Sequence, residues 1–161
     1  MQLRMKRNGL LFGVLFIGMT FLFSDCKKSS GPGQSPQDAQ LVKLSKTWII
    51  STATGSTDGV TLDGTPQTGY TSFALTINGT AGQTTFGYSI QGRPPLGPWP
   101  ASGTFTYGSD YATQLTRDDG LPITYSVTDT KLQMTFNYSG NGFSRVNNVK
   151  GNWVFNLSLK P

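Results

Sequence analysis

Histidine and glutamate are both absent from this 161-residue chain, and cysteine occurs only once. Histidine is the commonest general base and a usual zinc ligand, and glutamate is a frequent partner in acid–base pairs. We therefore expect a protein that is not an enzyme, with no catalytic residues, no metal site and no cofactor. A single cysteine excludes an internal disulfide, so the stability of the fold has to come from a packed core.

Long runs of one charge sign are also missing. The 13 Lys and Arg residues outnumber the eight acidic residues, which gives a formal net charge of +5. Three of the basic residues and one of the acidic residues fall within residues 1–25, so ten basic and seven acidic residues remain in the rest of the chain. This excess is weak and dispersed, and we expect no binding to nucleic acid.

The longest apolar run lies near the N-terminus, from Leu10 to Phe23. Basic residues precede it (Arg4, Lys6 and Arg7), and Cys26 follows it. A run of about 14 residues suits a signal peptide and is shorter than the roughly 20 residues of a membrane-spanning helix. The segment resembles a bacterial lipoprotein signal, which is cut before the cysteine so that the thiol carries a diacylglycerol. An uncleaved signal anchor with a chance cysteine is the alternative.

The resemblance implies a domain plan: a lipoprotein signal peptide at 1–25, a lipidated cysteine and flexible linker at 26–40, and a folded domain at 41–161. Acyl chains such as palmitate on Cys26 would hold the protein in a membrane, because each buried methylene contributes about 0.8 kcal/mol. The implied location is the cell envelope, as an outer-membrane lipoprotein. The residues just after Cys26 are basic and neutral rather than acidic, and this favours a periplasm-facing protein over a surface-exposed one.

Beyond residue 44 the chain alternates apolar and polar residues with a period of two, which is typical of β-strands. One or two helical turns, capped by Asp38, are expected before it. The apolar series lie at Trp48 and Ile50; Phe73, Leu75 and Ile77; Phe86, Tyr88 and Ile90; Phe105 and Tyr107; residues 113–117; Ile123, Tyr125 and Val127; Leu132, Met134, Phe136 and Tyr138; and Trp153, Phe155, Leu157 and Leu159. About eight strands predict an all-β antiparallel meander, which closes into a barrel or stacks as a two-layer sandwich.

Two short motifs accompany this pattern. Leu44-Ser45-Lys46-Thr47-Trp48 opens the first strand, and Pro98-Trp99-Pro100 comes shortly before Gly103-Thr104-Phe105. Together with the cysteine and the short linker, this layout resembles the lipocalin-like domains of unknown function in small Bacteroidota outer-membrane lipoproteins. The resemblance covers about residues 40–160 and implies an eight-stranded lipocalin-like barrel, with no activity attached.

Trp99 lies in a proline-rich segment, Arg93–Pro100, which cannot form a central strand. An exposed indole held by prolines loses little entropy on binding and suits stacking on a sugar or on an apolar group of a partner. Alternatively, Trp99 folds over one end of the barrel as a plug. Arg93 either binds an anion in this loop or is a solvated charge.

Two functions are compatible with these features. In the first, the barrel holds a small apolar or amphipathic ligand against inward residues such as Tyr88, Phe105 and Tyr125. In the second, the core is closed and the domain docks on a glycan or an envelope protein through the Trp99 loop. Both stay open because an eight-stranded barrel is only just wide enough for a cavity, so the aromatic residues alone can fill it.

Three further patterns have ordinary structural explanations. Asp118-Asp119-Gly120 resembles part of a calcium loop but supplies too few oxygens, so a turn is expected. Asp110 next to Tyr111 is a generic acid–tyrosine pair and is not expected to be catalytic. Trp48 and Trp153 belong to the first and last strands and are expected in the core, where the barrel would close.

Overall fold

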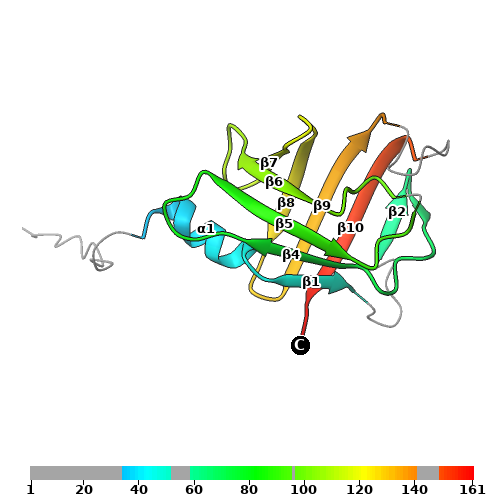
Figure 1. Ribbon diagram of the computed structural model, residues 1–161, viewed down its shortest axis with the longest axis horizontal. Coiled ribbons are helices and arrows are strands. Elements are labelled where there is room, and N and C mark those ends of the chain that lie inside the picture. The colour runs from blue at the N-terminus through cyan, green and yellow to red at the C-terminus, as the bar shows by residue number, and fades with distance from the viewer. Residues whose placement is uncertain (1–33, 52–58, 96, 141–148) are drawn as a thin grey trace, which may run out of the picture. The chain divides into compact units, whose positions relative to one another are not determined.

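The computed structural model describes residues 34–51, 59–95, 97–140 and 149–161 (Figure 1). In these ranges one helix precedes a series of strands. The elements are α1 (Pro36–Leu44), β1 (Thr47–Ile50), β2 (Val60–Leu62), β3 (Thr65–Pro66), β4 (Ala74–Asn78), β5 (Thr85–Gln91), β6 (Ser102–Tyr107), β7 (Gln114–Arg117), β8 (Pro122–Val127), β9 (Lys131–Tyr138) and β10 (Gly151–Leu159).

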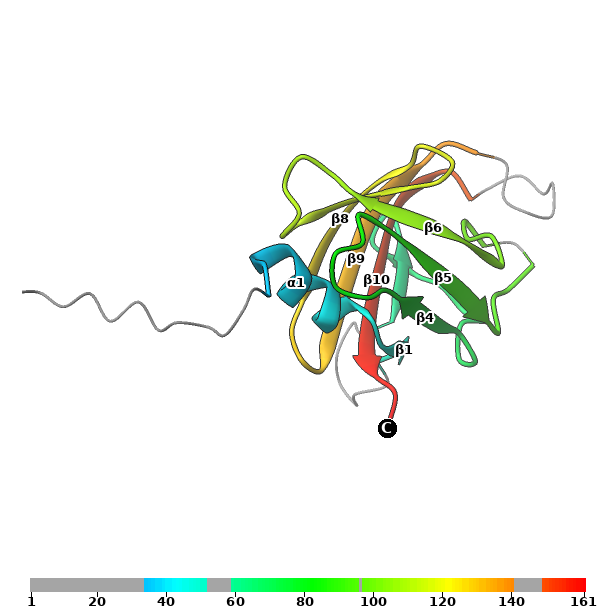
Figure 2. The same ribbon diagram turned by 60° about the vertical axis from the view of Figure 1, so that its left-hand side comes forward.

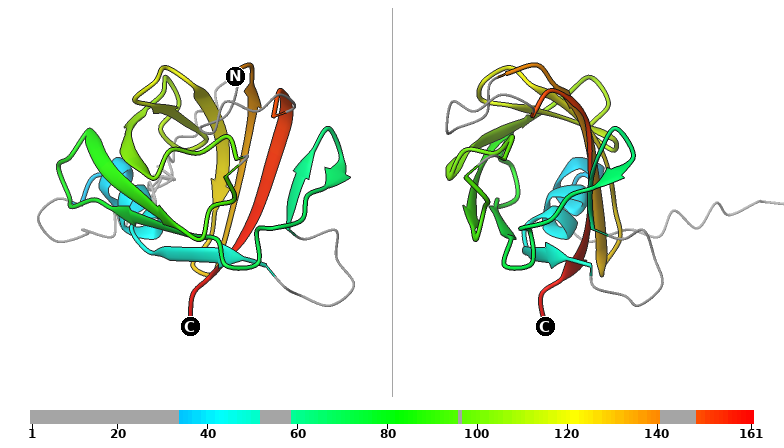
Figure 3. Two further views of the ribbon diagram at one scale, coloured as in Figure 1. Left: turned by 45° about the vertical axis from the view of Figure 1, so that its right-hand side comes forward. Right: turned by 90° about the vertical axis from the view of Figure 1, so that its right-hand side faces the viewer.

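The strands form a closed antiparallel barrel. Their order around the sheet is β1-β4-β5-β6-β7-β8-β9-β10, and β10 pairs back onto β1 at Trp48–Leu159 and Ile50–Leu157. The right-hand view of Figure 3 looks into this ring of strands. The prediction of an eight-stranded antiparallel barrel is therefore confirmed, and the sandwich alternative is not what the chain forms.

A small hairpin of β2 and β3 extends the sheet outside the ring. β2 pairs with β10 from Trp153 to Phe155, further along the same edge of β10 that β1 occupies. Asp63 and Gly64 form its turn with φ values of 49° and 77°. An Asp-Gly pair is a strong hairpin signal, but the sequence analysis missed this hairpin because its strands are too short to show alternation.

Helix α1 begins one turn earlier than expected. Ser35 is the N-cap: its hydroxyl accepts from the Asp38 backbone amide at 3.0 Å, and the Asp38 carboxylate accepts from the Ser35 amide at 3.2 Å. This reciprocal capping box places Asp38 at the third helical position, so the expectation that Asp38 is the cap was wrong. Pro36 at the first helical position lacks an amide hydrogen that would have no partner there.

The helix closes one end of the barrel. Leu41 and Leu44 are buried on its inner side. Gln40 Nε2 donates to the Ala112 carbonyl at 3.1 Å, and the Gly82 amide donates to the Asp38 carboxylate at 2.6 Å. These contacts join α1 to the turns that connect β6 to β7 and β4 to β5 (Figures 1 and 2).

The tryptophans of the first and last strands are buried in the core, as the alternation of apolar and polar residues predicted. Trp48 and Trp153 are 0% and 2% exposed, and their indole nitrogens donate to the carbonyls of Leu44 and Val149 at 2.9 and 2.7 Å. Both lie on strands of the seam at which the barrel closes. Within the described residues, no helix has the length and apolar character needed to cross a membrane.

Candidate functional site

The proline-rich loop between β5 and β6 closes the other end of the barrel. Successive antiparallel connections alternate between the two ends, and α1 contacts the β4–β5 and β6–β7 turns, so the β5–β6 loop lies opposite the helix. Trp99 from this loop is only 1% exposed. Its ring meets those of Tyr88, Phe105, Phe136 and Phe155 edge-on, with centroids 5.8, 6.3, 5.3 and 5.6 Å away.

This burial decides between the two predictions for Trp99. The indole is a plug inside the barrel, so the expectation of an exposed ring for stacking on a partner was wrong. The physical reason is the area of the ring: edge-to-face contacts with four aromatic neighbours stabilise it more than exposure to water does.

Two arginines donate hydrogen bonds to backbone carbonyl groups of the loop and hold it in place. Arg93 Nη1 donates to the Trp99 carbonyl at 3.1 Å, and Arg117 Nη1 donates to the Pro98 carbonyl at 2.9 Å. Arg93 belongs to the loop, whereas Arg117 comes from β7 on the barrel wall. The structure thus shows Arg93 bracing its own loop, and its predicted role in binding an anion stays a prediction.

Arg117 is a buried charge at the same end, and the sequence analysis did not identify it. The residue is 1% exposed, and its guanidinium makes two hydrogen bonds to the Asp119 carboxylate, at 2.9 Å from Nε and 2.5 Å from Nη2. The guanidinium carbon lies 5.3 Å from the centre of the Trp99 ring and 5.8 Å from that of Tyr138. The two hydrogen bonds from Arg117 to Asp119 lower the pKa of the Asp119 carboxyl group, whereas the partial burial of Asp119 raises it.

Arg117 lies two residues after Leu115, on the inward face of β7. This alternation was the sequence signal that could have identified Arg117 as buried.

Three polar side-chain atoms near the loop are buried and have no hydrogen-bond partner among the described residues. They are the hydroxyls of Tyr70 and Tyr88 and the indole nitrogen of Trp99. The Tyr70 hydroxyl lies under the loop, since a β-carbon built on Gly97 would be 3.3 Å from it. Buried polar groups in proteins are nearly always satisfied by protein, water or a ligand. An indole N–H can only donate, so its partner has to be an acceptor.

The structure brings together only some of the predicted ligand-binding residues. The rings of Tyr88 and Phe105 stack at 4.4 Å, and both contact Trp99. Tyr125 points towards the α1 end instead, where its hydroxyl donates to the Tyr111 carbonyl. Tyr125 therefore does not share a site with the other residues.

The carboxylates of the acidic turn bind protein groups in the structure. The Asp118 carboxylate accepts from the Thr104 amide at 3.2 Å, Asp119 pairs with Arg117, and Gly120 has a φ of 84° that suits a tight turn. Within the described ranges, no group of three or more metal-ligating side chains is found.

The Asp110 carboxylate also accepts hydrogen bonds from residues close to it in the sequence. Its carboxylate accepts from the Thr113 hydroxyl at 2.6 Å and from the Ala112 amide at 3.0 Å, and these bonds lower its pKa. The carboxylate thus stabilises the β6–β7 turn.

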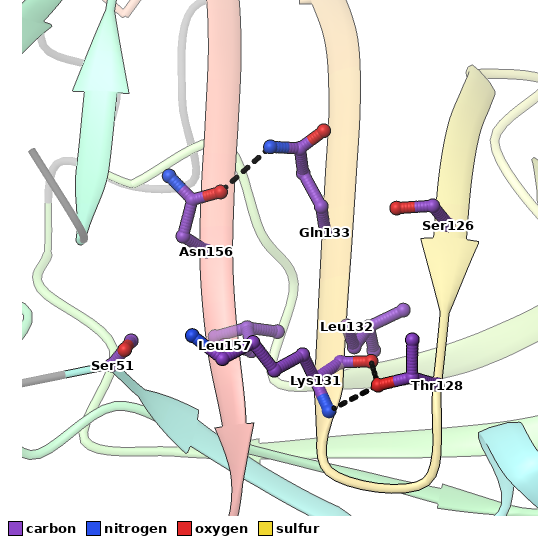
Figure 4. Close-up of a pocket in the computed structure, with 8 residues that line it drawn as sticks. All are labelled: Ser51, Ser126, Thr128, Lys131, Leu132, Gln133, Asn156 and Leu157. Carbon is purple, nitrogen blue, oxygen red and sulfur yellow. Dashed lines mark hydrogen bonds between the residues drawn. The ribbon is translucent and has the colours of Figure 1, made fainter. Parts of the chain in front are cut away.

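Besides a groove of about 390 Å³ beside the β4–β5 turn, lined by Ser45, Ile77, Gly79 and neighbouring residues, two further grooves lie outside the packed interior. One, of about 250 Å³, runs over β8, β9 and β10, where the Gln133 amide donates to Asn156 Oδ1 at 2.8 Å and the Lys131 side chain lies across β10 towards Ser51 (Figure 4). The second, of about 380 Å³, lies at the Trp99 end and is lined by Asp119, Asn137, Tyr138 and neighbouring residues. The second groove adjoins the Arg117–Asp119 pair and is the described groove closest to the plug loop.

Comparison of the chain with protein-family models, with curated proteins and with solved structures gives no match.

Alkaline pH is expected to destabilise the barrel from about pH 10 upwards. Burial raises the pKa of Tyr70, Tyr88 and Tyr107, and raises that of Tyr125 to about 12. A raised pKa means that the folded state keeps protons that the unfolded state releases. This stabilisation is complete below the unfolded pKa of about 10 and is lost as pH rises towards the folded values.

The measurement is tyrosinate absorbance recorded together with far-ultraviolet circular dichroism during an alkaline titration. The four tyrosines with a raised pKa are expected to ionise only as the β-sheet signal is lost. Ionisation of all six tyrosines near pH ~10 with an unchanged sheet signal would contradict the expectation.

Proposed function

We propose that this chain is a non-enzymatic, lipid-anchored lipoprotein of the cell envelope whose barrel holds a small amphipathic ligand at the plugged end. The single observation that carries the ligand proposal is a set of three buried atoms around one loop that find no hydrogen-bond partner among the described residues: Tyr70 Oη, Tyr88 Oη and Trp99 Nε1. Each unsatisfied buried polar group costs about 1–3 kcal/mol. A molecule that supplies hydrogen-bond acceptors there recovers part of that cost.

The surroundings of these atoms favour an amphipathic ligand over a purely apolar one. The rings of Tyr88, Phe105 and Phe155 offer an apolar wall to the body of a ligand. The Trp99 N–H and the guanidinium of Arg117, which has five N–H groups and makes three hydrogen bonds to described residues, favour an acceptor-bearing head.

The anchor and the location rest on the N-terminal sequence. The signal-like run that ends at Cys26 supports acylation of that cysteine, and the basic and neutral residues after it support an outer-membrane protein that faces the periplasm. The anchor would keep the barrel at the membrane surface, where amphipathic molecules are concentrated.

Native mass spectrometry tests the ligand proposal. The mature chain 26–161, carrying Cys26→Ser to keep it soluble, is incubated with an envelope extract, repurified and compared with the same chain carrying Tyr88→Phe. We expect a bound small molecule on the first chain and roughly tenfold lower occupancy on the second, because one hydrogen bond is lost while the ring is kept.

Tyr125→Phe is the matched control. It removes a hydroxyl whose partner is the Tyr111 carbonyl at the other end of the barrel, so the ligand is expected to remain. A chain that is bare before any of these changes contradicts the ligand proposal. Equal occupancy in Tyr88→Phe places the ligand away from the plug.

A second candidate is a closed-core interaction module. The observation that favours it is the packed interior, with Trp99 in contact with four rings, next to the polar groove at Asp119, Asn137 and Tyr138. Such a groove suits a glycan or a polar segment of an envelope protein. A bare barrel in the mass-spectrometric test favours this function.

A further inference from the structure

The end of the barrel that α1 covers carries exposed apolar side chains. Val42 on α1 is 54% exposed and Tyr111 in the β6–β7 turn is 38% exposed, and they are the large hydrophobic residues that the described part of the chain leaves open to solvent. The two segments are joined, since Gln40 of α1 donates to the Ala112 carbonyl at 3.1 Å. Both residues therefore belong to one end of the molecule.

Lysines surround the same end. Lys43 follows Val42 on α1 and is exposed. Lys46 Nζ donates to the Asp129 carbonyl at 2.8 Å, in the turn that leads into β9 at Lys131. Lys160 follows β10, and its amide donates to the Thr47 carbonyl at 2.9 Å. Lys43, Lys46 and Lys160 thus lie where α1, the start of β1, the β8–β9 turn and the end of β10 meet, whereas the Lys131 side chain turns away across β10 (Figure 4).

The acidic residues at this end are bound close to the barrel or lie within a turn. Asp38 accepts from the Gly82 amide at 2.6 Å and Asp110 accepts from the Ala112 amide at 3.0 Å, while Asp129 lies in the β8–β9 turn. The ammonium groups of Lys43 and Lys160 sit on four-carbon stems and can extend further from the barrel than these short carboxylates. These two ammonium groups can therefore reach an anionic surface past the carboxylates.

The chain also enters the barrel here. Ser35, the N-cap of α1, follows Cys26 by nine residues. Nine residues span at most about 30 Å when fully extended. Acyl chains on Cys26 would thus keep the α1 end within that distance of the membrane.

We propose that the α1 end of the barrel docks on an anionic lipid surface, with Val42 and Tyr111 among the headgroups and the lysines on lipid phosphates. Aromatic and apolar side chains flanked by lysine are the chemistry that binds a membrane interface. The docking rests on the proposed acylation of Cys26. It turns the Trp99 end, and the ligand site proposed there, away from the membrane.

Fluorescence quenching in vesicles tests the orientation. The acylated mature protein carries Val42→Cys or, as the matched control, Thr65→Cys in the β2–β3 hairpin at the opposite end. An environment-sensitive dye is attached, and the vesicles contain phosphatidylethanolamine, phosphatidylglycerol and a nitroxide-labelled lipid. We expect strong quenching at position 42 and several-fold weaker quenching at position 65. Equal quenching at both positions, or none at position 42, overturns the docking.

A charge variant distinguishes binding to anionic lipid from closeness to the membrane that the acyl anchor alone would cause. Lys43→Gln is expected to lower the contact equilibrium reported at position 42 about fivefold, the effect of removing one lysine from an anionic surface. Lys150→Gln, an exposed lysine at the other end, is expected to change nothing. The same quenching in neutral phosphatidylcholine vesicles, or equal effects of the two variants, overturns the role of anionic lipid.

The count of dyes tests the anchor independently. Acylation blocks the thiol of Cys26, so each labelled variant takes one dye per chain. Two dyes per chain show a free Cys26, which overturns the anchor and with it this docking. One dye with equal quenching at the two ends overturns the docking alone.

Discussion

Replacing Trp99 with alanine is expected to lower the free energy of unfolding by about 3–5 kcal/mol, the usual cost of removing a large buried aromatic side chain. The indole is 1% exposed and lies edge-on to Tyr88, Phe105, Phe136 and Phe155. Its loss leaves a space at the centre of the barrel and removes the ring against which Arg117 packs at 5.3 Å. Urea denaturation followed by tyrosine fluorescence and circular dichroism measures the effect.

Trp99→Phe is the matched control for this prediction. Phenylalanine keeps most of the aromatic contact and removes an N–H that has no partner among the described residues, so a loss of roughly 1–2 kcal/mol is expected, less than half of the alanine effect. A Trp99→Ala protein as stable as the parent would show that the indole is not part of the core. In that case the loop would be free to present Trp99 to a partner.

The barrel could be predicted because alternation is a property of strands. Residues such as Leu132, Met134 and Phe136 repeat every second position, and this fixes both the strand and its inward face before any contact is known. Because the turns between consecutive strands are short, neighbouring strands are expected to pair in antiparallel fashion. What alternation leaves open is closure, which depends on the pairing of β1 with β10 across more than 100 residues.

The plug could not be predicted in the same way. Trp99 lies in a loop, where no periodicity shows which way a side chain faces, so both burial and exposure remained compatible with the sequence. Arg117 is different: its position after Leu115 marks it as inward, but charged residues are almost never fully buried unless they are paired. Its burial depends on Asp119, two residues away, and on the Pro98 carbonyl supplied by a distant loop.

The start of α1 was misplaced for a related reason. Ser35 and Asp38 both suit a cap by composition, and only the reciprocal bonds between them distinguish the cap from the third helical residue. The packed helix therefore includes residues 36–40, which the sequence analysis had placed in the linker.

Replacing Asp119 in the Arg117–Asp119 pair is expected to lower the free energy of unfolding more than replacing Arg117 does. Asp119→Asn leaves a guanidinium at 0% side-chain exposure without its counter-charge, and a loss of about 2–3 kcal/mol is expected. This is below the range for fully buried pairs because 44% of the Asp119 side chain is exposed and water screens part of the attraction. Arg117→Met removes the charge and keeps an apolar stem between Trp99 and Tyr138, so a smaller loss is expected.

The pH dependence of these variants separates the ion pair from packing. The pKa of Asp119 is lowered in the folded state, chiefly by its hydrogen bonds from Arg117. A lowered pKa stabilises the fold above the unfolded value of about 4, and this stabilisation is lost as pH falls through the folded pKa. Urea denaturation at neutral pH should therefore show the full difference between Asp119→Asn and the parent, and the difference should shrink in acid.

Two outcomes would contradict this account of the pair. One is a difference between Asp119→Asn and the parent that stays the same from neutral to acid pH, because an effect without protonation would come from packing alone. The other is a greater loss in Arg117→Met than in Asp119→Asn. That result would make the hydrogen bond from Arg117 to the Pro98 carbonyl, rather than the balance of charge, the main contribution of Arg117, and it would identify β7 as the element that fastens the plug loop.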